Sequence, residues 1–296
     1  MNILITGGTG FIGQRLCARL QALGHQVSVL SRRPGKADLP GVRQIGRLEE
    51  AGPVHAVVNL AGEPLTTGRW TAARKQVLLD SRLGTTRDLL AWMSALAERP
   101  RVLVSGSAIG YYGPRGDEPL DENASPGHDF AAVLCRRWEA EAFAAEALGV
   151  RTCVLRTGIV LGRDGGALAR MLPPFRLGAG GPMGDGRQWM SWIHRDDLVG
   201  MIIWMLENPH ARGAYNGTAP APVTNAVFAR TLAAALHRPA LITAPAFALK
   251  LAFGEMAGLL LTGQNVLPRH ALDEGFSFQY PTLERALQAI LADAAP

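Results

Sequence analysis

The stretch TGGTGFIG, at residues 6–13, constrains the fold of this chain more than any other feature. It follows the short apolar run NILIT and opens a segment, residues 11–23, whose apolar side chains recur at helical spacing. Such a glycine turn is typical of a dinucleotide site, because Gly7 permits the tight turn, Gly10 lets a pyrophosphate approach the backbone and Gly13 lets the helix pack closely. The stretch therefore predicts dinucleotide binding rather than an ordinary turn.

The start of the helix after this turn belongs to the predicted site. The first N–H groups of a helix have no partner inside it, so the residues that open this one, Phe11 and Ile12, are predicted to face the cofactor phosphates. The partial positive charge of a helix N-terminus also favours a bound anion.

The end of the second predicted strand distinguishes NADP from NAD. An NAD site carries Asp or Glu here, about 20 residues after the glycine turn, to bind the ribose 2′-hydroxyl. The chain instead reads VLSRRPGK, with a hydroxyl on Ser31 and guanidinium groups on Arg32 and Arg33 that suit a 2′-phosphate. NADP(H) is therefore the predicted cofactor. The alternative is that both arginines are solvated surface residues.

Strand-like and helix-like runs alternate through the first half of the chain. Strands are expected at residues 2–6, 27–31, 55–62, 101–107 and 151–162, and helices at 11–23, within 71–96 and at 130–148. Strand, crossover helix and strand repeated in this way indicate a parallel sheet with helices on both faces. The predicted fold class is α/β, a Rossmann-type doubly wound parallel sheet with a small C-terminal α/β lobe.

The composition of the sequence changes near residue 162. Loops rich in glycine and proline, such as LPPFRLGAGGPMGDGRQ, then alternate with helical runs. We expect an NADP-binding Rossmann core at residues 1–162. A mixed lobe at 163–296 is expected to cover the carboxyl ends of the strands, with the chain free to return to the core sheet, and to end in a distinct segment at about 245–293.

Composition excludes several classes of protein. The net charge of +5 comes without a run of five basic residues, so nucleic-acid binding is not indicated. The most apolar late stretch, residues 247–261, carries Lys250 and Glu255, so no membrane segment is predicted. Three cysteines and seven histidines are scattered singly, so no metal site is predicted. Without disulfide spacing or a leader segment, the expected location is the cytoplasm.

Several further motifs carry a resemblance to a known superfamily. TGGTGFIG with VVNLAG, SGSAIGYYG and LRTGIVLG resembles the extended short-chain dehydrogenase/reductase superfamily over about residues 1–220. LAGEPL, GRWTAARK, SRLGTT, WIHRDDLVG, YNGTAPAPVTN and LLLTGQNVLPRHALDEGFSFQYP are similar to its atypical group of epimerase family proteins, across the whole chain. The resemblance implies a Rossmann fold, NADP(H) and a C-terminal domain of unknown role. A sugar-nucleotide epimerase is the activity that the group's label suggests.

The resemblance also implies contacts outside the glycine turn. Leu60, Ala61 and Gly62 are expected along the adenosine and ribose side, at a strand end where ligands bind in open α/β sheets. Arg82 matches a position near the cofactor, although it could be an ordinary helix-surface charge. Ser107 matches the serine that holds the substrate oxygen, and its alternative role is to cap a loop.

The stretch FAAVLCRRWEAE, at residues 130–141, departs from the superfamily. There, a tyrosine and a lysine four residues later supply the acid–base group, and an asparagine supports the lysine. With Glu139 as the reference point, Ala131 stands at the tyrosine position and Cys135 at the lysine position, while Ser81 replaces the asparagine. The usual proton-transfer chemistry therefore cannot operate from this helix.

Two explanations remain open from the sequence. In the first, another phenol takes over: Tyr111 or Tyr112 follows Ser107 and could be tuned by Lys75, Arg82 or His194, although Tyr112 also matches a structural turn residue. In the second, the protein binds NADP(H) without turning it over and acts as a cofactor-sensing regulator. The leading interpretation is an NADP(H)-dependent oxidoreductase or epimerase acting on a carbonyl or hydroxyl of a small metabolite. A homodimer is left open.

Overall fold

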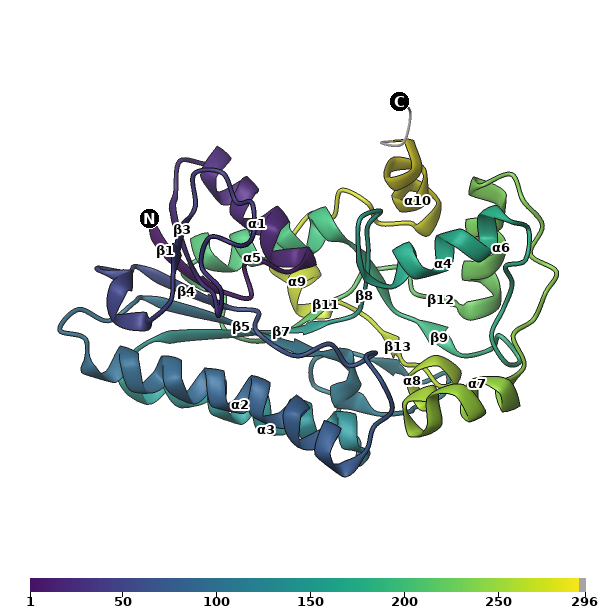
Figure 1. The fold of residues 1–296 in the computed structure, drawn as a ribbon, viewed down its shortest axis with the longest axis horizontal. Helices are drawn as coiled ribbons and strands as arrows, with labels where there is room; N and C mark the ends of the chain where they lie inside the picture. Colours follow the sequence, from purple (N-terminus) through teal and green to yellow (C-terminus); the bar gives the residue numbers. More distant parts are fainter. Residues whose placement is uncertain (293–296) are drawn as a thin grey trace.

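The computed structural model describes residues 1–292 of the chain. A seven-stranded sheet forms its centre, in the order β11-β7-β5-β4-β1-β2-β3, and every neighbouring pair is parallel (Figure 1). The chain winds outward from β1 first in one direction and then in the other, so the predicted doubly wound α/β fold is confirmed. The strands are β1 (Asn2–Thr6), β2 (Gln26–Leu30), β3 (Arg43–Ile45), β4 (Ala56–Asn59), β5 (Val102–Ala108), β7 (Arg151–Thr157) and β11 (Gly213–Gly217).

The central strands are apolar runs because both of their faces are covered. All four residues of β4 and the first six of β5 are buried. Along β1 the side chains alternate between two hydrophobic cores, with Ile3 and Ile5 in one and Leu4 in the other. Such strands require a helix layer on each face of the sheet.

The two helix layers lie on opposite faces (Figure 1). One contains α1 (Phe11–Ala22) and α5 (Arg195–Glu207), and the other contains α2 (Ala72–Ala95) and α3 (Phe130–Phe143). α2 begins where the Thr71 side chain accepts a hydrogen bond from an N–H of the first turn, and Asp129 does the same for α3. Short 3-10 helices complete this half: η1 (Leu48–Ala51), η2 (Ile109–Tyr112) and η3 (Ala144–Leu148).

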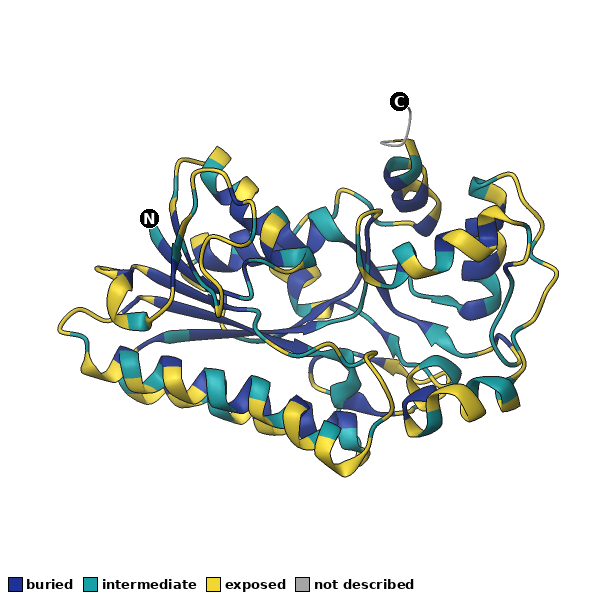
Figure 2. Cartoon of the chain, viewed as in Figure 1, coloured by how far each residue is buried: buried dark blue, intermediate teal, exposed yellow. Residues whose placement is uncertain are grey.

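A second hydrophobic core lies beside the sheet and is visible as a separate group of buried residues (Figure 2). It is built around Leu168, Trp192, Phe228 and Leu287, all of which are buried. The elements of this lobe are β8 (Ile159–Leu161), α4 (Gly166–Arg176), β9 (Trp189–Met190), β10 (Trp192–His194), β12 (Val223–Thr224), α6 (Asn225–Ala235) and α10 (Leu283–Ala292).

The C-terminal segment crosses back to the Rossmann half. It contains α7 (Ala246–Phe253), η4 (Gly254–Ala257), α8 (Gly258–Leu261), β13 (Asn265–Val266) and α9 (Arg269–Asp273). β13 pairs in parallel with β6 (Pro119–Leu120), which follows η2 in the chain. Within residues 1–292, no helix combines the length and the apolar character needed to cross a bilayer.

Asp197, in the first turn of α5, fastens the last part of the chain to this helix. Its carboxylate is buried and accepts hydrogen bonds from the backbone N–H groups of Gln279 and Tyr280, at 2.7 and 2.9 Å. The Tyr280 ring also lies 3.9 Å from the His194 ring, measured between centroids. Asp197 therefore holds the strand-like approach to α10 against the start of α5.

Replacing Asp197 with alanine should lower the free energy of unfolding by about 2–3 kcal/mol, because two charge-assisted hydrogen bonds are lost and their N–H donors stay partly buried. Urea denaturation measures the change. The matched control is Asp88→Ala on the exposed face of α2, which should stay within about 0.5 kcal/mol of the parent. Equal stability of the two variants would contradict this role for Asp197.

Candidate cofactor and catalytic site

The glycine turn between β1 and α1 has no room for a side chain at Gly7, Gly8 or Gly13. Gly7 has φ +71°, and a Cβ there would lie 2.6 Å from the carbonyl carbon of Leu60. A Cβ on Gly13 would lie 2.3 Å from the Gly7 carbonyl oxygen. Gly10 is different, because only the Gly7 oxygen, at 3.2 Å, lies near its side-chain position. The backbone of Gly10 is therefore open to a ligand, as the motif requires.

The N-terminus of α1 has no side-chain cap. Gly10 is the residue before the helix, and its own N–H is satisfied by the Gly7 carbonyl oxygen at 3.0 Å. Helices α2 and α3 both have a capping side chain, so α1 differs from them in leaving its first N–H groups to a ligand or to solvent. This arrangement fits a bound phosphate.

Phe11 and Ile12 both lie at this turn, but their side chains point into protein. The Phe11 ring packs on the glycine loop at residues 162–166, where a Cβ on Gly165 would lie 2.5 Å from the ring. The Arg195 guanidinium covers the same ring, at 4.7 Å from its centroid. Ile12 packs against the core beneath α1. Any contact of these two residues with a cofactor is thus through the backbone.

Ser31, Arg32 and Arg33 directly follow β2 at the carboxyl edge of the sheet. The Ser31 hydroxyl accepts a hydrogen bond from the Arg33 N–H at 3.1 Å, which shapes the turn. The Arg32 side chain is 93% exposed and lies 3.3 Å from Glu63 Oε1, and Arg33 is exposed as well. Both guanidinium groups are therefore accessible to a phosphate in solution.

The ends of β1 and β4 are joined by side-chain hydrogen bonds. Thr6 Oγ1 donates to Asn59 Oδ1 at 2.6 Å and accepts from the Ala61 N–H at 3.3 Å. This fixes residues 60–62 beside the glycine turn. Leu60 and Ala61 are half-buried there, whereas Gly62 is exposed.

Arg82 lies directly against Gly62, since a Cβ on that glycine would be 3.0 Å from the guanidinium carbon. The side chain is only 9% exposed and stacks over the Trp138 ring at 5.2 Å. Its Nη1 donates to the Leu78 carbonyl oxygen at 3.2 Å, and burial lowers its pKa. In the described chain it has no carboxylate within ion-pair distance. A buried cation in this state is stabilised by an acceptor-rich ligand.

Ser107 lies near the end of β5, and its hydroxyl is already engaged. Its Oγ donates to Glu139 Oε1 at 2.7 Å. Arg156 holds the same carboxylate with two bonds, from Nε to Oε1 and from Nη2 to Oε2, both at 2.9 Å. The Arg156 and Glu139 side chains are each 5% exposed. Burial acts to lower the pKa of Arg156, but its bonds to Glu139 raise that pKa above its usual value.

Neither member of this ion pair was assigned a role from the sequence. Glu139 served only as a reference point for alignment. The available signal was Arg156, a charged residue in the otherwise buried strand RTCVLRT. A buried strand arginine requires a partner, but the sequence does not say which.

Tyr112 is fully buried and its hydroxyl is engaged on both sides. It donates to Asn216 Oδ1 at 2.6 Å and accepts from Arg156 Nη1 at 3.0 Å, while burial raises its pKa to about 12. These contacts support the structural alternative for this residue. Tyr111 is half-buried, and its ring lies 3.5 Å from the Arg156 guanidinium carbon, so it is the more accessible phenol of the two.

Ala131 and Cys135, which the superfamily resemblance matches to the tyrosine and lysine, are closely packed. At Gly110 in η2, a Cβ would lie 3.3 Å from the Ala131 Cβ, so η2 occupies the space above the helix that a larger side chain would need. Cys135 is buried, and desolvation raises its pKa to about 12. Ser81, at the asparagine position, accepts a hydrogen bond from the Glu63 N–H at 3.1 Å.

Two of the residues proposed to tune a relocated phenol are engaged elsewhere. Lys75 pairs with Glu255 of the C-terminal segment, with both carboxylate oxygens at 2.7 Å. His194 accepts the Asp196 N–H at 3.0 Å and stacks on Tyr280 at the start of α5. Arg82 is the remaining candidate, and it lies close enough to Cys135 to affect the pKa of that thiol.

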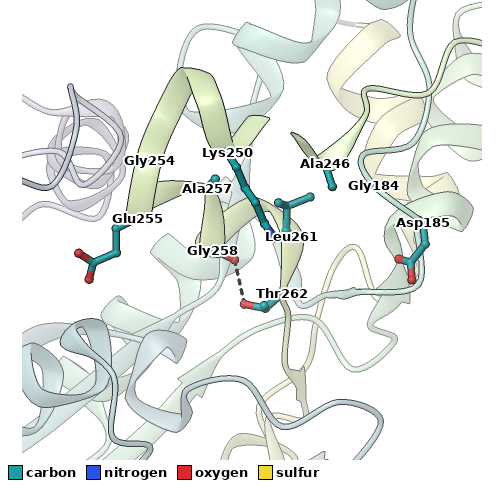
Figure 3. Close-up of a pocket in the computed structure, with 10 residues that line it drawn as sticks. All are labelled: Gly184, Asp185, Ala246, Lys250, Gly254, Glu255, Ala257, Gly258, Leu261 and Thr262. Carbon is teal, nitrogen blue, oxygen red and sulfur yellow. Dashed lines mark hydrogen bonds between the residues drawn. The ribbon is translucent and has the colours of Figure 1, made fainter. Parts of the chain in front are cut away.

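A cavity of about 700 Å³ lies at the C-terminal segment, and Glu255, the partner of Lys75, is one of its lining residues (Figure 3). It is bounded by the loop at residues 184–185 and by α7, η4 and α8. The Lys250 and Leu261 side chains point into it, whereas Glu255 points away. Ala246, Ala257 and other small residues form the rest of the wall. This cavity was not anticipated from the sequence, because its walls come from segments distant in the chain.

Two protein-family models match the chain. The model of the NAD dependent epimerase/dehydratase family matches residues 3–216, and that of a domain of unknown function, DUF1731, matches residues 244–290. Over 98% of its length the chain is 44% identical to the epimerase family protein SDR39U1 homolog, chloroplastic, of Arabidopsis thaliana, 87% of which is covered. It is 40% identical to the epimerase family protein YfhF of Bacillus subtilis, with 99% of each chain covered.

Solved structures show the same relationship. The crystal structure of human epimerase family protein SDR39U1 with NADPH is similar at a TM-score of 0.91 and 40% identity, covering 99% of this chain and 100% of that one. A UDP-galactose 4-epimerase has a TM-score of 0.74 at 20% identity, covering 99% of each chain, and shares the fold.

All three cysteines should resist alkylation in the folded protein. Burial raises the pKa of Cys135 to about 12 and the pKa values of Cys17 and Cys153 to about 11, so the reactive thiolate is scarce at pH values near neutrality. Mass spectrometry after iodoacetamide treatment should find no adduct unless the protein is first unfolded in urea. Rapid native alkylation of Cys135 would show that this thiol faces an open site.

Proposed function

Because the chain belongs to the NAD dependent epimerase/dehydratase family, we propose that it binds NADP(H) and uses it in a redox step on a small metabolite. The observation that carries the proposal is the uncapped glycine turn, with Arg32 and Arg33 following the adjacent strand. The NADPH found with the human relative supports the same cofactor. The reacting group would be a carbonyl or a hydroxyl, as reductase or epimerase.

Residues at the carboxyl ends of the parallel strands fit the pyrophosphate, the ribose and the 2′-phosphate of such a cofactor. Backbone N–H groups of residues 11–13 would hold the pyrophosphate, and Ser31, Arg32 and Arg33 would hold the 2′-phosphate. Residues 60–62 would line the ribose side. Arg82 would supply a desolvated cation to the same ligand, because it has donors but no carboxylate partner in the described chain.

The bound nicotinamide would supply a hydride donor or acceptor. The chain's own part would be to bind the substrate oxygen and to handle its proton. Ser107 is the candidate for the first task, since it matches the superfamily serine and lies at the carboxyl end of β5. Of the two tyrosines that the sequence offered for the second task, Tyr111 is the more accessible. An epimerase of this kind would oxidise and reduce the substrate in turn, with no net consumption of NADPH.

The second candidate function is a cofactor sensor without turnover. The observation in its favour is that Ala131 and Cys135, where the usual acid–base pair would stand, are closely packed and buried, and that burial raises the pKa of the Cys135 thiol. The C-terminal segment reaches the region before α2 through Arg69, which donates to the carbonyl oxygens of Leu251 and Ala252. A cofactor bound beside residues 60–62 would thus lie one loop away from that contact.

The double variant Arg32→Ala, Arg33→Ala should weaken NADPH binding by roughly 10- to 100-fold, because charge-assisted bonds to the 2′-phosphate are lost. NADH binding should hardly change. Isothermal titration calorimetry measures both constants. The matched control is Arg136→Ala, Arg137→Ala, another adjacent and exposed pair on α3. Equal affinity of the parent for NADH and NADPH would refute the 2′-phosphate site.

Turnover is tested by following nicotinamide absorbance with NADPH, and separately with NADP⁺, against a panel of carbonyl compounds, alcohols and nucleotide sugars. Parent protein should turn over at least one compound, and Ser107→Ala should slow it by about 100-fold or more. Tight cofactor binding with no turnover of any compound would favour the sensor.

A further inference from the structure

The Ser107 hydroxyl has only one hydrogen, and a buried carboxylate holds it. The 2.7 Å bond to Glu139 Oε1 is charge-assisted, and such bonds are about twice as strong as neutral ones. Ser107 itself is 5% exposed, and the buried Cys135 thiol lies within hydrogen-bond reach of it. What its hydroxyl can offer a ligand is an oxygen lone pair, so Ser107 is presented as a hydrogen-bond acceptor.

The Glu139 carboxylate is itself fixed by Arg156. That guanidinium bonds to both carboxylate oxygens, and its Nη1 donates to the Tyr112 hydroxyl at 3.0 Å and to the Glu122 carbonyl oxygen at 3.1 Å. The Tyr111 ring covers one face. Since every nitrogen of the Arg156 guanidinium has a partner, the carboxylate is held in place beside Ser107.

The register of the sheet explains why these groups meet. Ser107 on β5 and Arg156 on β7 are partners on neighbouring parallel strands, and Asn216 on β11 is the next partner in the same row. Partners of this kind share a face of the sheet. Glu139 comes down from α3 onto that face, one helical turn after Cys135, the position of the missing lysine.

We propose that Ser107 and Glu139 form a proton relay that takes the place of the tyrosine and lysine. Ser107 accepts a hydrogen bond from the hydroxyl group of an alcohol substrate. The proton released from that hydroxyl passes through Ser107 to Glu139. The proposal rests on the proposed function, because it needs an oxidised nicotinamide as the hydride acceptor. It names the substrate class as an alcohol, which donates a hydrogen bond to Ser107, with the corresponding ketone or aldehyde as product.

The step balances in protons and electrons. The substrate O–H bond breaks and its proton goes to Ser107 Oγ, while the original Ser107 hydrogen moves to Glu139 Oε1. The electron pair of the substrate C–H bond leaves as the hydride that the oxidised nicotinamide accepts, and the C–O bond becomes a carbonyl. One positive charge disappears from the nicotinamide and one negative charge from Glu139. The reverse step returns the stored proton, which suits an epimerase.

This charge balance predicts a difference between the two redox forms of the cofactor. Glu139→Gln removes one negative charge and leaves Arg156 unpaired, so NADP⁺ should bind more weakly relative to NADPH. The dissociation constant for NADP⁺ divided by that for NADPH should rise by about five-fold or more. The matched control, Glu141→Gln, removes the same charge two residues along α3, where Glu141 pairs with Arg87 on the surface. There the ratio should stay unchanged, because exposed charges are screened.

A second variant reverses the sign of the effect. Arg156→Gln leaves the carboxylate unpaired, so NADP⁺ should bind more tightly relative to NADPH. This variant also serves if Glu139→Gln fails to fold, and thermal unfolding identifies folded samples. A purely structural role for the ion pair would weaken both cofactor forms alike. Folded variants with unchanged ratios would therefore overturn the relay.

Turnover provides the second readout, on whichever compound of the panel the parent protein converts. Ser107→Ala and Glu139→Gln should each slow it by about 100-fold or more, and the double variant should be no slower than either one. Losses that multiply, or a Glu139→Gln rate within three-fold of the parent (about 0.7 kcal/mol or less), would overturn the relay. If the parent converts nothing, the enzymatic function fails, and the NADP⁺/NADPH ratio still decides whether Glu139 acts on the cofactor.

Discussion

The buried ion pair between Arg156 and Glu139 ties several elements of the candidate site together. It joins β7 to α3 and, through Ser107 and Tyr112, to β5 and η2. Removing one partner of such a pair costs about 3–5 kcal/mol, because the other charge stays buried without compensation. Apolar residues would stabilise this position as well, so the stability of the fold alone does not account for the pair.

The same network extends to the C-terminal segment. Glu122 accepts the Asn216 N–H through one carboxylate oxygen and the His270 N–H through the other, at 2.9 and 3.2 Å. The Asn216 side-chain oxygen in turn accepts a hydrogen bond from the Tyr112 hydroxyl. The segment that matches a domain of unknown function is thereby bonded to the surroundings of Ser107. A continuous chain of hydrogen bonds thus runs from this segment through Asn216 and Tyr112 to Arg156.

On the cofactor side of the site, the shape of the glycine turn is set by steric limits. Gly7 and Gly13 leave no room for a side chain, and the open backbone at Gly10 leads to an uncapped helix. Exposed arginines and the desolvated Arg82 then supply positive charge around this turn. Shape therefore admits the dinucleotide, and charge is proposed to select its phosphorylated form.

Most of the fold could be predicted from the sequence by itself, because the signals are local. Apolar strands, helical periodicity and the glycine turn each depend on neighbouring residues, and they indicated the parallel sheet and the dinucleotide motif. The absence of a tyrosine and a lysine between residues 130 and 141 was equally plain. The residues proposed to act in their place are brought together only by tertiary structure. Strand register puts Ser107 beside Arg156, and helix packing brings Glu139 onto both, although 32 residues separate the serine from the glutamate. The Glu139 carboxylate then takes the hydrogen of the Ser107 hydroxyl, and no local pattern in the chain encodes that direction.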